Sequence, residues 1–462
     1  MAQSGTTTPQ APVAKGVTYP QDYTLKSLVL LSQFGSYDLK NSFIEVSYYE
    51  DIFSSFISGV LVISEAEGLI ERFNMVGNEY IRLSFSKASD KTFAVDKLFR
   101  IYKISNRQLV GTMQSEGYMI HFCSDELLLS EQYKVSKSYP NKPVSNIIVD
   151  ILQNYLRVPA KKKLNIEPTK GVYDFIVPNF KPFEAINWLS TYAQSATNGV
   201  IGADMIFFEN KFGYNFYSLQ TLFQQPIYKT YNYKPKSFEN ANETLDDKFY
   251  AVISYQHTDS FDTLQGINSG VFANQLISID PLLQTHYTTN FNYNKYFDAS
   301  KSLNKHPITN GVKNRFDAAL YDTSQAVIKV ATTNSKQKNI PYLANKPGSF
   351  SKDIFIEQYV PNRTAQLSLS NYHKITMKIN GDPGASAGLT IQFDLLSMNP
   401  STNKKEKDRF NSGKYLISAV KHTIDIDGYT TVLEIVKDST PKQYATPNMD
   451  QSIWRNTVKG IT

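Results

Sequence analysis

Two stretches of the chain, one towards each end, alternate apolar and polar residues as half-buried β-strands do. Towards the front, residues 77–85 predict one strand, residues 98–104 a second and residues 119–122 a third. A turn is expected at residues 116–118, where a glycine stands just before the third strand. Together these segments predict one β unit.

The same succession of features recurs towards the back of the chain. Residues 388–395 predict a first strand, residues 414–420 a second, and residues 430–436 a third. A turn at residues 427–429 precedes the third strand. The back of the chain therefore predicts a second β unit of similar make-up.

Glycines open and close the two units at matching distances. Gly77 and Gly117 are as far apart as Gly388 and Gly428, although the middle strand is placed differently in each unit. The match predicts one β module present twice, with Gly77 near Gly388 and Gly117 near Gly428 on superposition. Such a repeat suits a ring-forming structural protein better than an enzyme with one site. The alternative is a pair of unrelated β-hairpins.

Between the two units the pattern changes to a mixture of helices and strands. Apolar residues from 147 to 155 recur on one helical face, and Pro143 suits the first turn of that helix. Pro182 suits the start of a second helix, in which apolar residues from 183 to 189 share a face. Residues 205–217 then predict a hairpin around a turn-like centre.

These patterns predict a mainly β fold with α+β insertions. We expect two tube-like β-barrel or sandwich domains duplicated in one chain, and a middle α+β domain. Residues 266–350 show little periodicity and are too many for an ordinary loop, which predicts an inserted subdomain. The expected order is a flexible arm at 1–24, a first tube-like domain at 25–133, the middle domain at 134–235, a second tube-like domain at 236–265 and 351–440 that is interrupted by the 266–350 insertion, and a C-terminal tail at 441–462.

Composition changes this picture only a little. A chain of 462 residues, 41% of them hydrophobic, should hold roughly three domains. Its 30 Tyr and 28 Phe suit surfaces buried against other proteins, although strands also favour aromatic residues. The net charge of +6 is spread along the chain, which argues against specific nucleic-acid recognition but is compatible with contact with passing DNA.

The chain carries no pattern typical of secretion or of a membrane span. Cys123 is the only cysteine, so no disulfide can form within the chain. No apolar run reaches the roughly 18 residues that span a bilayer. Residues 1–24 lack the apolar segment of a signal peptide and indicate a flexible arm.

No arrangement of residues predicts catalysis, a cofactor or a metal site. The histidines do not have the spacing of zinc ligands. His121 and Cys123 share one strand face, but a nucleophile and base would need a third group to orient them, so we expect both to be structural. The six histidines are His121, His257, His286, His306, His373 and His422.

Two other segments resemble functional motifs only superficially. The glycine-rich residues 381–388 precede an alternating strand instead of the helix that a phosphate cradle needs, so a turn is expected. Three successive lysines at 161–163 predict a solvated loop. Neighbouring carboxylates such as Glu50 and Asp51 point to opposite faces of a strand and so do not form an acid–base pair. The chain is accordingly expected to be a structural protein and no enzyme.

Several short motifs, in their order along the chain, resemble the baseplate hub proteins of T-even-type contractile phages. That group is related to the late-control-D-type tail proteins and to the hub halves of type VI secretion spikes. The resemblance covers most of residues 25–440. The segments that carry it are 75–79, 177–180, 182–189, 207–216, 415–422 and 428–429.

The resemblance implies a specific assembly. Hubs of this family are homotrimers in which each chain gives two tube-like domains, so that three chains form a pseudo-six-fold ring. That ring adapts the six-fold tail tube to the three-fold central spike, and its hole continues the channel for DNA. The implied partners are the spike, the tube or tube-initiator protein and surrounding baseplate proteins, in a virion assembled in the host cytoplasm. Because no spike-like repeat follows the hub, the needle is expected to be a separate protein.

Two alternatives remain at this stage. The same architecture serves as the hub of a bacterial contractile injection or secretion apparatus. A carbohydrate-binding or carbohydrate-active β protein would use its aromatic residues to stack on sugars, but that class does not explain two module copies.

The polar C-terminal tail is expected to dock onto a partner or a neighbouring chain. Trp454 is one of only 2 tryptophans and stands among few other large apolar residues. Buried aromatic anchors commonly dominate interfaces, so Trp454 is the candidate partner contact. The alternative is that the tail folds back on its own chain. Truncation after Lys437 is expected to leave the folded core intact, because the last predicted strand ends before it.

Overall fold

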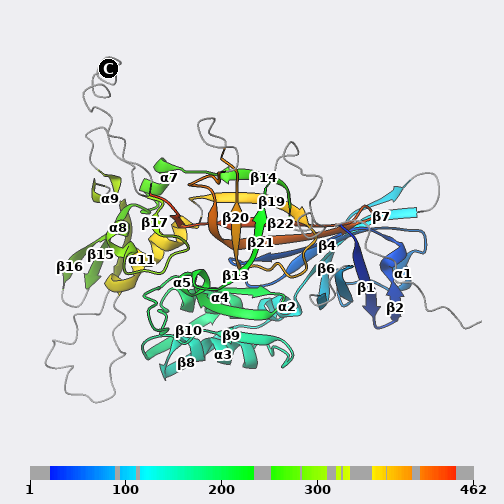
Figure 1. The fold of residues 1–462 in the computed structure, drawn as a ribbon. Helices are drawn as coiled ribbons and strands as arrows, with labels where there is room; N and C mark the ends of the chain where they lie inside the picture. Colours follow the sequence, from blue (N-terminus) through cyan, green and yellow to red (C-terminus); the bar gives the residue numbers. More distant parts are fainter. Residues whose placement is uncertain are drawn as a thin grey trace, which may run out of the picture.

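The computed structural model describes residues 21–88, 94–110, 115–233, 251–280, 284–309, 319–323, 326–332, 356–370, 372–397 and 406–443. The prediction of a mainly β fold is confirmed: one large sheet runs through the molecule (Figure 1) and contains 13 strands. Trp454, the arm before residue 21 and the tail from residue 444 lie outside the described residues.

The first part of the large sheet, which we call the N-terminal half-sheet, is formed by strands β1 to β7. Its strands run in the order β3-β4-β7-β6-β5-β1-β2, and every pairing among them is antiparallel. Its alternating apolar residues pack into one core, which two short helical segments help to cover. The elements are β1 (Tyr23–Ser32), β2 (Gly35–Asp38), η1 (Leu39–Asn41), β3 (Phe43–Asp51), β4 (Ser58–Glu65), α1 (Leu69–Arg72), β5 (Tyr80–Lys87), β6 (Ala94–Val110) and β7 (Ser115–Cys123).

The remaining strands of the large sheet form the C-terminal half-sheet. They run in the order β13-β20-β21-β22-β19-β14 and enclose a second core. The β13–β20 pairing is parallel, and the other pairings are antiparallel. The strands are β13 (Ile227–Asn232), β14 (Val252–Asp259), β19 (Lys374–Asn380), β20 (Thr390–Asp394), β21 (Gly413–Asp425) and β22 (Tyr429–Val436).

A middle unit of helices and two small sheets lies beside the large sheet (Figure 1). Helix α3 begins after Pro143 and buries the apolar face that its sequence predicts. Helix α4 begins at Pro182, and the Glu184 carboxylate accepts a hydrogen bond from the backbone N–H of Lys181. The elements are α2 (Asp125–Gln132), β8 (Val135–Lys142), α3 (Val144–Asn154), β9 (Lys163–Ile166), β10 (Tyr173–Phe180), α4 (Pro182–Ser190), β11 (Met205–Asn210), β12 (Gly213–Ser218) and α5 (Leu219–Phe223).

A further unit, which we call the insertion, lies between β14 and β19 in the chain and projects from the C-terminal half-sheet (Figure 1). Strand β15 pairs antiparallel with β16 and parallel with β18, and the helix α11 packs on this small sheet. The elements are α7 (Thr263–Asn268), β15 (Ala273–Asp280), β16 (Thr285–Asn292), α8 (Tyr293–Phe297), β17 (His306–Pro307), α9 (Leu320–Thr323), β18 (Ala326–Thr332) and α11 (Ile356–Leu369).

Two sequence predictions about the strands are wrong. Residues 116–118 do not form a turn, because Gly117 lies within β7 and pairs with Ser64 on one side and Gln108 on the other. The chain also continues in ordered structure beyond Lys437. Strand β23 (Ser439–Thr440) pairs with β17. Truncation after Lys437 would therefore remove part of the folded core.

Candidate functional site

The feature that organises the molecule is the pairing of β21 with β3, which we call the seam. It joins the two half-sheets into one sheet, although the two strands come from opposite ends of the chain. The pairing is antiparallel and runs from Ala419 opposite Asp51 to Asp425 opposite Glu45. The seam is thus a strand-to-strand junction between two β units within one polypeptide.

Strand β21 can make this junction because it is long and changes partner halfway along one edge. Leu416 pairs with β22 on one side and with β20 on the other, so β20 and β3 share the edge that faces away from β22. Between the two partners a bulge at Ser418 interrupts the register. The carbonyl of Ser418 accepts a hydrogen bond from the N–H of Ile52 at 2.9 Å, at the end of β3.

Aromatic rings close the seam against water. The rings of Tyr48 and His422 lie 5.5 Å apart, and those of His422 and Tyr429 lie 5.9 Å apart. The Tyr429 hydroxyl and His422 Nδ1 are 2.8 Å apart and form a hydrogen bond. Burial lowers the pKa of His422 to about 3, so its ring is neutral at ordinary pH.

A buried carboxylate ties three parts of the molecule together at the seam. Glu50 on β3 is 1% exposed. It accepts hydrogen bonds from the Tyr48 hydroxyl at 2.7 Å, the Ser386 hydroxyl at 2.6 Å and the Ala387 N–H at 2.9 Å. The N–H of Lys211, in the β11–β12 hairpin, donates a fourth bond at 2.8 Å. Glu50 therefore connects the N-terminal half-sheet, the loop before β20 and the middle unit.

The glycine-rich loop 381–388 is held by a second set of polar contacts. As the sequence predicts, the loop is made of turns and leads into a strand, β20. The Asp382 carboxylate accepts hydrogen bonds from Lys229 Nζ and the Tyr231 hydroxyl, each at 2.9 Å. Burial alone would raise the pKa of Asp382, but Lys229 and these hydrogen bonds hold it below its usual value.

A lysine of the middle unit reaches the same loop. The Lys211 ammonium donates to the carbonyls of Pro383 and Gly384 at 2.5 and 2.6 Å. Burial lowers the pKa of Lys211 to about 8. The polar atoms of the loop backbone are thus used to position the loop.

The buried carboxylate of Glu209 takes part in an ion pair within the middle unit and also anchors that unit to the ends of strands in the N-terminal half-sheet. Lys162 Nζ lies 2.7 Å from both Glu126 and Glu209. Glu209 also accepts hydrogen bonds from the Ser124 hydroxyl at 2.5 Å and the Ile57 N–H at 3.2 Å. The prediction of a solvated loop at residues 161–163 is therefore wrong for Lys162, because two carboxylates on neighbouring elements draw its side chain inward.

His121 and Cys123, which share a strand face in the sequence pattern, both have the surroundings of structural residues. His121 Nε2 lies 2.7 Å from the Ser105 hydroxyl, and burial lowers its pKa. Cys123 is buried, and burial raises the pKa of its thiol to about 12, so the thiolate is scarce. The two side chains thus have separate environments.

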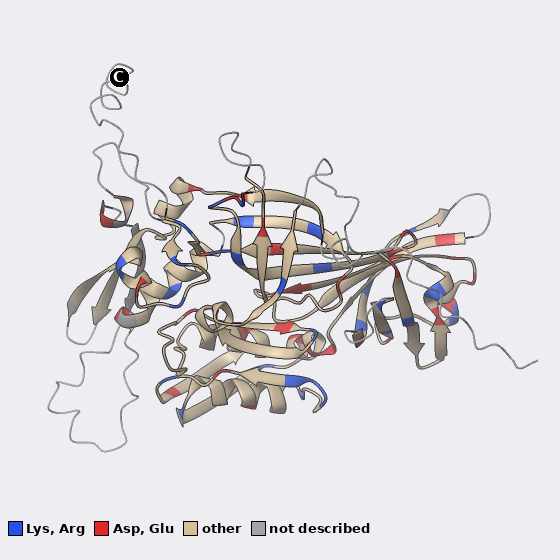
Figure 2. Cartoon of the chain, viewed as in Figure 1, with Lys and Arg blue, Asp and Glu red and all other residues tan. Residues whose placement is uncertain are grey.

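In the described part of the chain, no group of three or more His, Cys, Asp or Glu side chains is placed to hold a metal ion. Nor is any described helix both long and apolar enough to cross a membrane. Lysines, arginines and carboxylates are interspersed along the elements (Figure 2), as the spread of charge in the sequence indicates.

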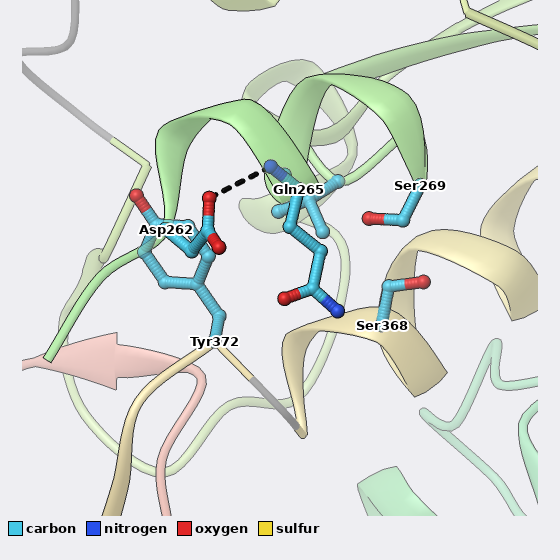
Figure 3. Close-up of a pocket in the computed structure, with 7 residues that line it drawn as sticks. Asp262, Gln265, Ser269, Ser368 and Tyr372 are labelled. Carbon is cyan, nitrogen blue, oxygen red and sulfur yellow. Dashed lines mark hydrogen bonds between the residues drawn. The ribbon is translucent and has the colours of Figure 1, made fainter. Parts of the chain in front are cut away.

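A small pocket lies in the insertion, between α7 and the end of α11 (Figure 3). Asp262 and Gln265 come from the start of α7, and Ser368 and Tyr372 come from the end of α11 and the residues after it. The Asp262 carboxylate accepts a hydrogen bond from the Gln265 N–H at 2.8 Å, which caps helix α7. This carboxylate therefore has a structural role.

Sequence reasoning did not find the seam residues. In the sequence Glu50 stands beside Asp51, and its partners Ser386 and Ala387 lie more than 300 positions away. The available signal is that Glu50 falls on the same strand face as the buried Tyr48. Trp454, the proposed partner contact, remains a prediction because it lies outside the described residues.

Comparisons with known proteins agree with this architecture. No protein-family model matches the chain. The chain is 22% identical over 415 residues to the probable baseplate hub protein gp334 of Vibrio phage KVP40, a match that covers 87% of this chain and 91% of the relative.

One solved structure shows the same kind of fold. The tail protein from Neisseria meningitidis MC58 superposes with a TM-score of 0.51 at 9% identity, covering 92% of this chain and all (100%) of that one. The 43 kDa tail protein of prophage MuSo2 from Shewanella oneidensis gives a TM-score of 0.49 at 7% identity, covering 89% of this chain and 98% of that one. The fold is therefore similar to that of the Neisseria tail protein. The sequence match agrees with the predicted resemblance: over most of its length the chain is similar to a phage baseplate hub protein.

Proposed function

We propose that this protein is a structural hub in the baseplate of a contractile phage tail. The observation that carries the proposal is the relationship to a baseplate hub protein over 87% of the chain. That relative is a phage protein, which favours a phage hub over the hub of a secretion apparatus. The buried polar groups described above join parts of the fold to one another, which suits a structural role and no enzymatic one.

The proposed duplication is supported by the strand order of the two half-sheets. The order β3-β4-β7-β6-β5-β1 in one corresponds to β14-β19-β22-β21-β20-β13 in the other. The corresponding strands also follow one another in the same order along the chain. One pairing differs, because β1 and β5 are antiparallel whereas β13 and β20 are parallel.

Strand register supports the duplication at the level of single residues. Tyr80 lies opposite Arg100 at the start of β5, as Thr390 lies opposite Leu416 at the start of β20. Each long strand then has a bulge two residues later, at Tyr102 in β6 and Ser418 in β21. Unrelated hairpins have no reason to share both a register and a bulge.

This register also adjusts the proposed correspondence of glycines. By strand register, Gly388 corresponds to Asn78, one position after Gly77. Gly428 corresponds to Ser115, two positions before Gly117. Gly77 and Gly388 nevertheless both have a positive φ, of 96° and 89°. Each lies just before one of two corresponding strands, β5 and β20.

The strand pairings also refine the proposed domains. Strand β13, inside the span 134–235 assigned to the middle domain, belongs with the second unit by its pairing to β20. Helix α11, inside the span 351–440, packs with the insertion. We therefore propose that the insertion comprises all residues between β14 and β19.

A chain with two such units is suited to a ring. Three copies would supply six similar units, which would adapt a six-fold tail tube to a three-fold spike and leave a central channel for DNA. In this proposal the protein is a virion component, assembled in the host cytoplasm, that contacts the spike, the tube or tube initiator and surrounding baseplate proteins.

Mass measurement and imaging test the proposal together. Light scattering and native mass spectrometry of the purified full-length chain, alone and with its spike, should give a homotrimer. End-on electron micrographs should show a central hole. A chain that stays monomeric even with the spike present would overturn the ring.

A further inference from the structure

The two halves of the large sheet differ at a pair of corresponding strand edges: one edge is paired with another strand and the other is not. Strand β6 pairs with β7 through residues 100–110 on one edge. On its other edge it pairs with β5 only through residues 94–100. Beyond residue 100, that second edge of β6 meets no strand in the described part of the chain.

The corresponding edge in the other half-sheet is filled by the seam. Strand β21 pairs with β20 through residues 413–416 and then, past the bulge, with β3 through residues 419–425. By strand order and register, β6 corresponds to β21. Residues 103–110 of β6 therefore occupy the position at which a strand docks in the other half.

The strand that corresponds to β3 is also available. Strand β14 ends the large sheet and pairs with β19 on one edge. Among the described residues β14 itself pairs with no second strand, and the residue before it, Ala251, makes a single bridge to Asn232 of β13. Strands β3 and β14 match in detail, because each has a bulge one residue after its start, at Ile44 and Ile253. These two isoleucines are 44% and 45% exposed.

We propose that the edge of β6 at residues 103–110 binds β14 of a second copy of this chain, antiparallel and in the register of the seam. The inference rests on the proposed ring and specifies which strands close it. Three seams within chains would then alternate with three β6–β14 junctions between chains. No strand edge at these positions would remain open, as expected for a soluble β protein.

The register follows on each side of a second bulge in β6, between Ser105 and Gln108, which β21 lacks. Thr423 pairs with the residue of β22 that lies opposite Asn380 on β19. Gln108 pairs with the residue of β7 that lies opposite Ser64 on β4, which is the equivalent position, so Thr423 and Gln108 correspond. Ser47 and Gln256 correspond in the same way, through their partners on β4 and β19. Since Ser47 lies opposite Thr423 in the seam, Gln256 of one copy should lie opposite Gln108 of the next.

Burial supports the same register. In the seam Ile424 lies opposite Val46, and each is 1% exposed. The residue of β6 that corresponds to Ile424 is Leu109, which is 75% exposed in the single chain. Its partner across the proposed junction is Tyr255. A leucine at a core-like position of a free strand edge is explained if a second copy covers it.

Paired cysteines test the junction directly. In the seam the side-chain oxygens of Ser47 and Thr423 are 3.5 Å apart, so Ser47→Cys with Thr423→Cys should oxidise to a disulfide within one chain. Gln108→Cys with Gln256→Cys should instead give covalent dimers and trimers on a non-reducing gel. Cys123 is buried and should not compete.

The outcomes of this experiment are distinct. A trimer in native mass spectrometry without a Gln108–Gln256 cross-link, while the Ser47–Thr423 control forms, would overturn the junction and leave the proposed function standing. The absence of any trimer would overturn both. Efficient cross-linking by Gln108→Cys alone would show β6 paired with β6, and stronger cross-linking of Gln108→Cys with Tyr255→Cys would show another register; either result contradicts the proposal.

A charge on the edge gives an independent readout. Leu109→Asp should leave the melting temperature of the single chain unchanged, because Leu109 is already exposed, and should raise the concentration needed for trimer formation at least about tenfold. Leu98→Asp is the control, since Leu98 is 53% exposed on the same strand but lies where β5 already pairs. Equal trimer formation by Leu109→Asp and the native chain, or equal loss in both variants, would contradict the assignment.

Discussion

Glu50 shows how much of this fold depends on single buried polar groups. All four of its hydrogen-bonding partners are donors, and they come from three parts of the chain. If an amide replaces a carboxylate that accepts every bond, its NH2 group, which is a donor, faces another donor. A substitution of Glu50 therefore tests directly how the parts of the fold are joined.

We expect Glu50→Gln to lower the free energy of unfolding by about 3 kcal/mol, because buried donors lose a charged acceptor. Urea-induced unfolding followed by fluorescence measures the change. Glu45→Gln on the same strand is the matched control: Glu45 is 40% exposed and its ion pair with Lys421 spans 4.0 Å, so the expected loss is below about 1 kcal/mol. Equal effects of the two variants would contradict the role assigned to Glu50.

His422 gives the seam a predictable response to acid. Its pKa in the folded chain is lowered to about 3 by burial, below the value of about 6.5 in an unfolded chain. The unfolded chain therefore binds the proton first, and the contribution of His422 to stability falls as the pH drops below about 6.5 towards 3. The residues around the His422 ring are Lys211, Asp382, Tyr48 and Tyr429. All four are unchanged when His422 alone is substituted.

We expect His422→Gln to unfold at a lower temperature than the native chain at pH 7 but to lose less stability between pH 6.5 and 4.5. Melting curves of both proteins across this range measure the difference. The comparison is needed because Asp204 and Asp438, whose pKa values burial raises to about 6, act in the opposite sense as the pH falls. Parallel pH profiles for the two proteins would show that His422 does not sense pH.

At the scale of elements, β3 and β4 depend on a close approach of their backbones. A Cβ on Gly59 of β4 would lie 2.5 Å from the Ser47 carbonyl and 2.2 Å from the Phe122 ring. We expect Gly59→Ala to destabilise the chain by about 2 kcal/mol, because neither the strand nor the packed ring can move freely. Chemical unfolding measures this.

Gly68 supplies the control for that substitution. Its φ is +64°, but apart from the glycine itself and adjacent backbone no atom lies within 4 Å of the position that a Cβ would take, and asparagine tolerates this backbone conformation. Gly68→Asn should therefore change stability by less than about 0.5 kcal/mol. A Gly59→Ala protein as stable as Gly68→Asn would show that β3 and β4 can separate without cost.

Local pattern predicted the elements better than it predicted their partners. Alternation placed β5, β20 and β22, and helical spacing placed α3 and α4, because these signals depend on neighbours in the chain. The turn expected at Gly117 was wrong, since a glycine inside a paired strand resembles a glycine at a turn. The seam was not predictable in this way, because its pairing joins strands about 370 residues apart, and alternation does not say which strands pair.

At the scale of the whole molecule, the ordered chain extends past the last large strand. Asp438 accepts a hydrogen bond from the Leu303 N–H at 3.1 Å, and the Ser439 hydroxyl accepts one from Asn304 at 2.7 Å. We expect truncation after Gln443 to leave the melting temperature unchanged and truncation after Lys437 to lower it. Differential scanning calorimetry of the two proteins tests this.

The same truncation addresses the proposed role of the tail. If Trp454 anchors the tail on a partner or a neighbouring chain, the protein that ends at Gln443 should assemble less well with tube or spike while remaining folded. Trp454→Ala in the full chain should have the same effect. Assembly by both proteins at the native level would show that the tail is dispensable.

The seam also has a consequence for how such an assembly would start. Because β3 and β21 belong to one polypeptide, their pairing needs no encounter between molecules, and the tether gives it a high effective concentration. Of six junctions in the proposed ring, half would already exist in every folded chain before any two chains met. Only the other half would respond to dilution, so a population of folded, half-assembled chains could persist until a partner that binds three of them at once brings the ring together.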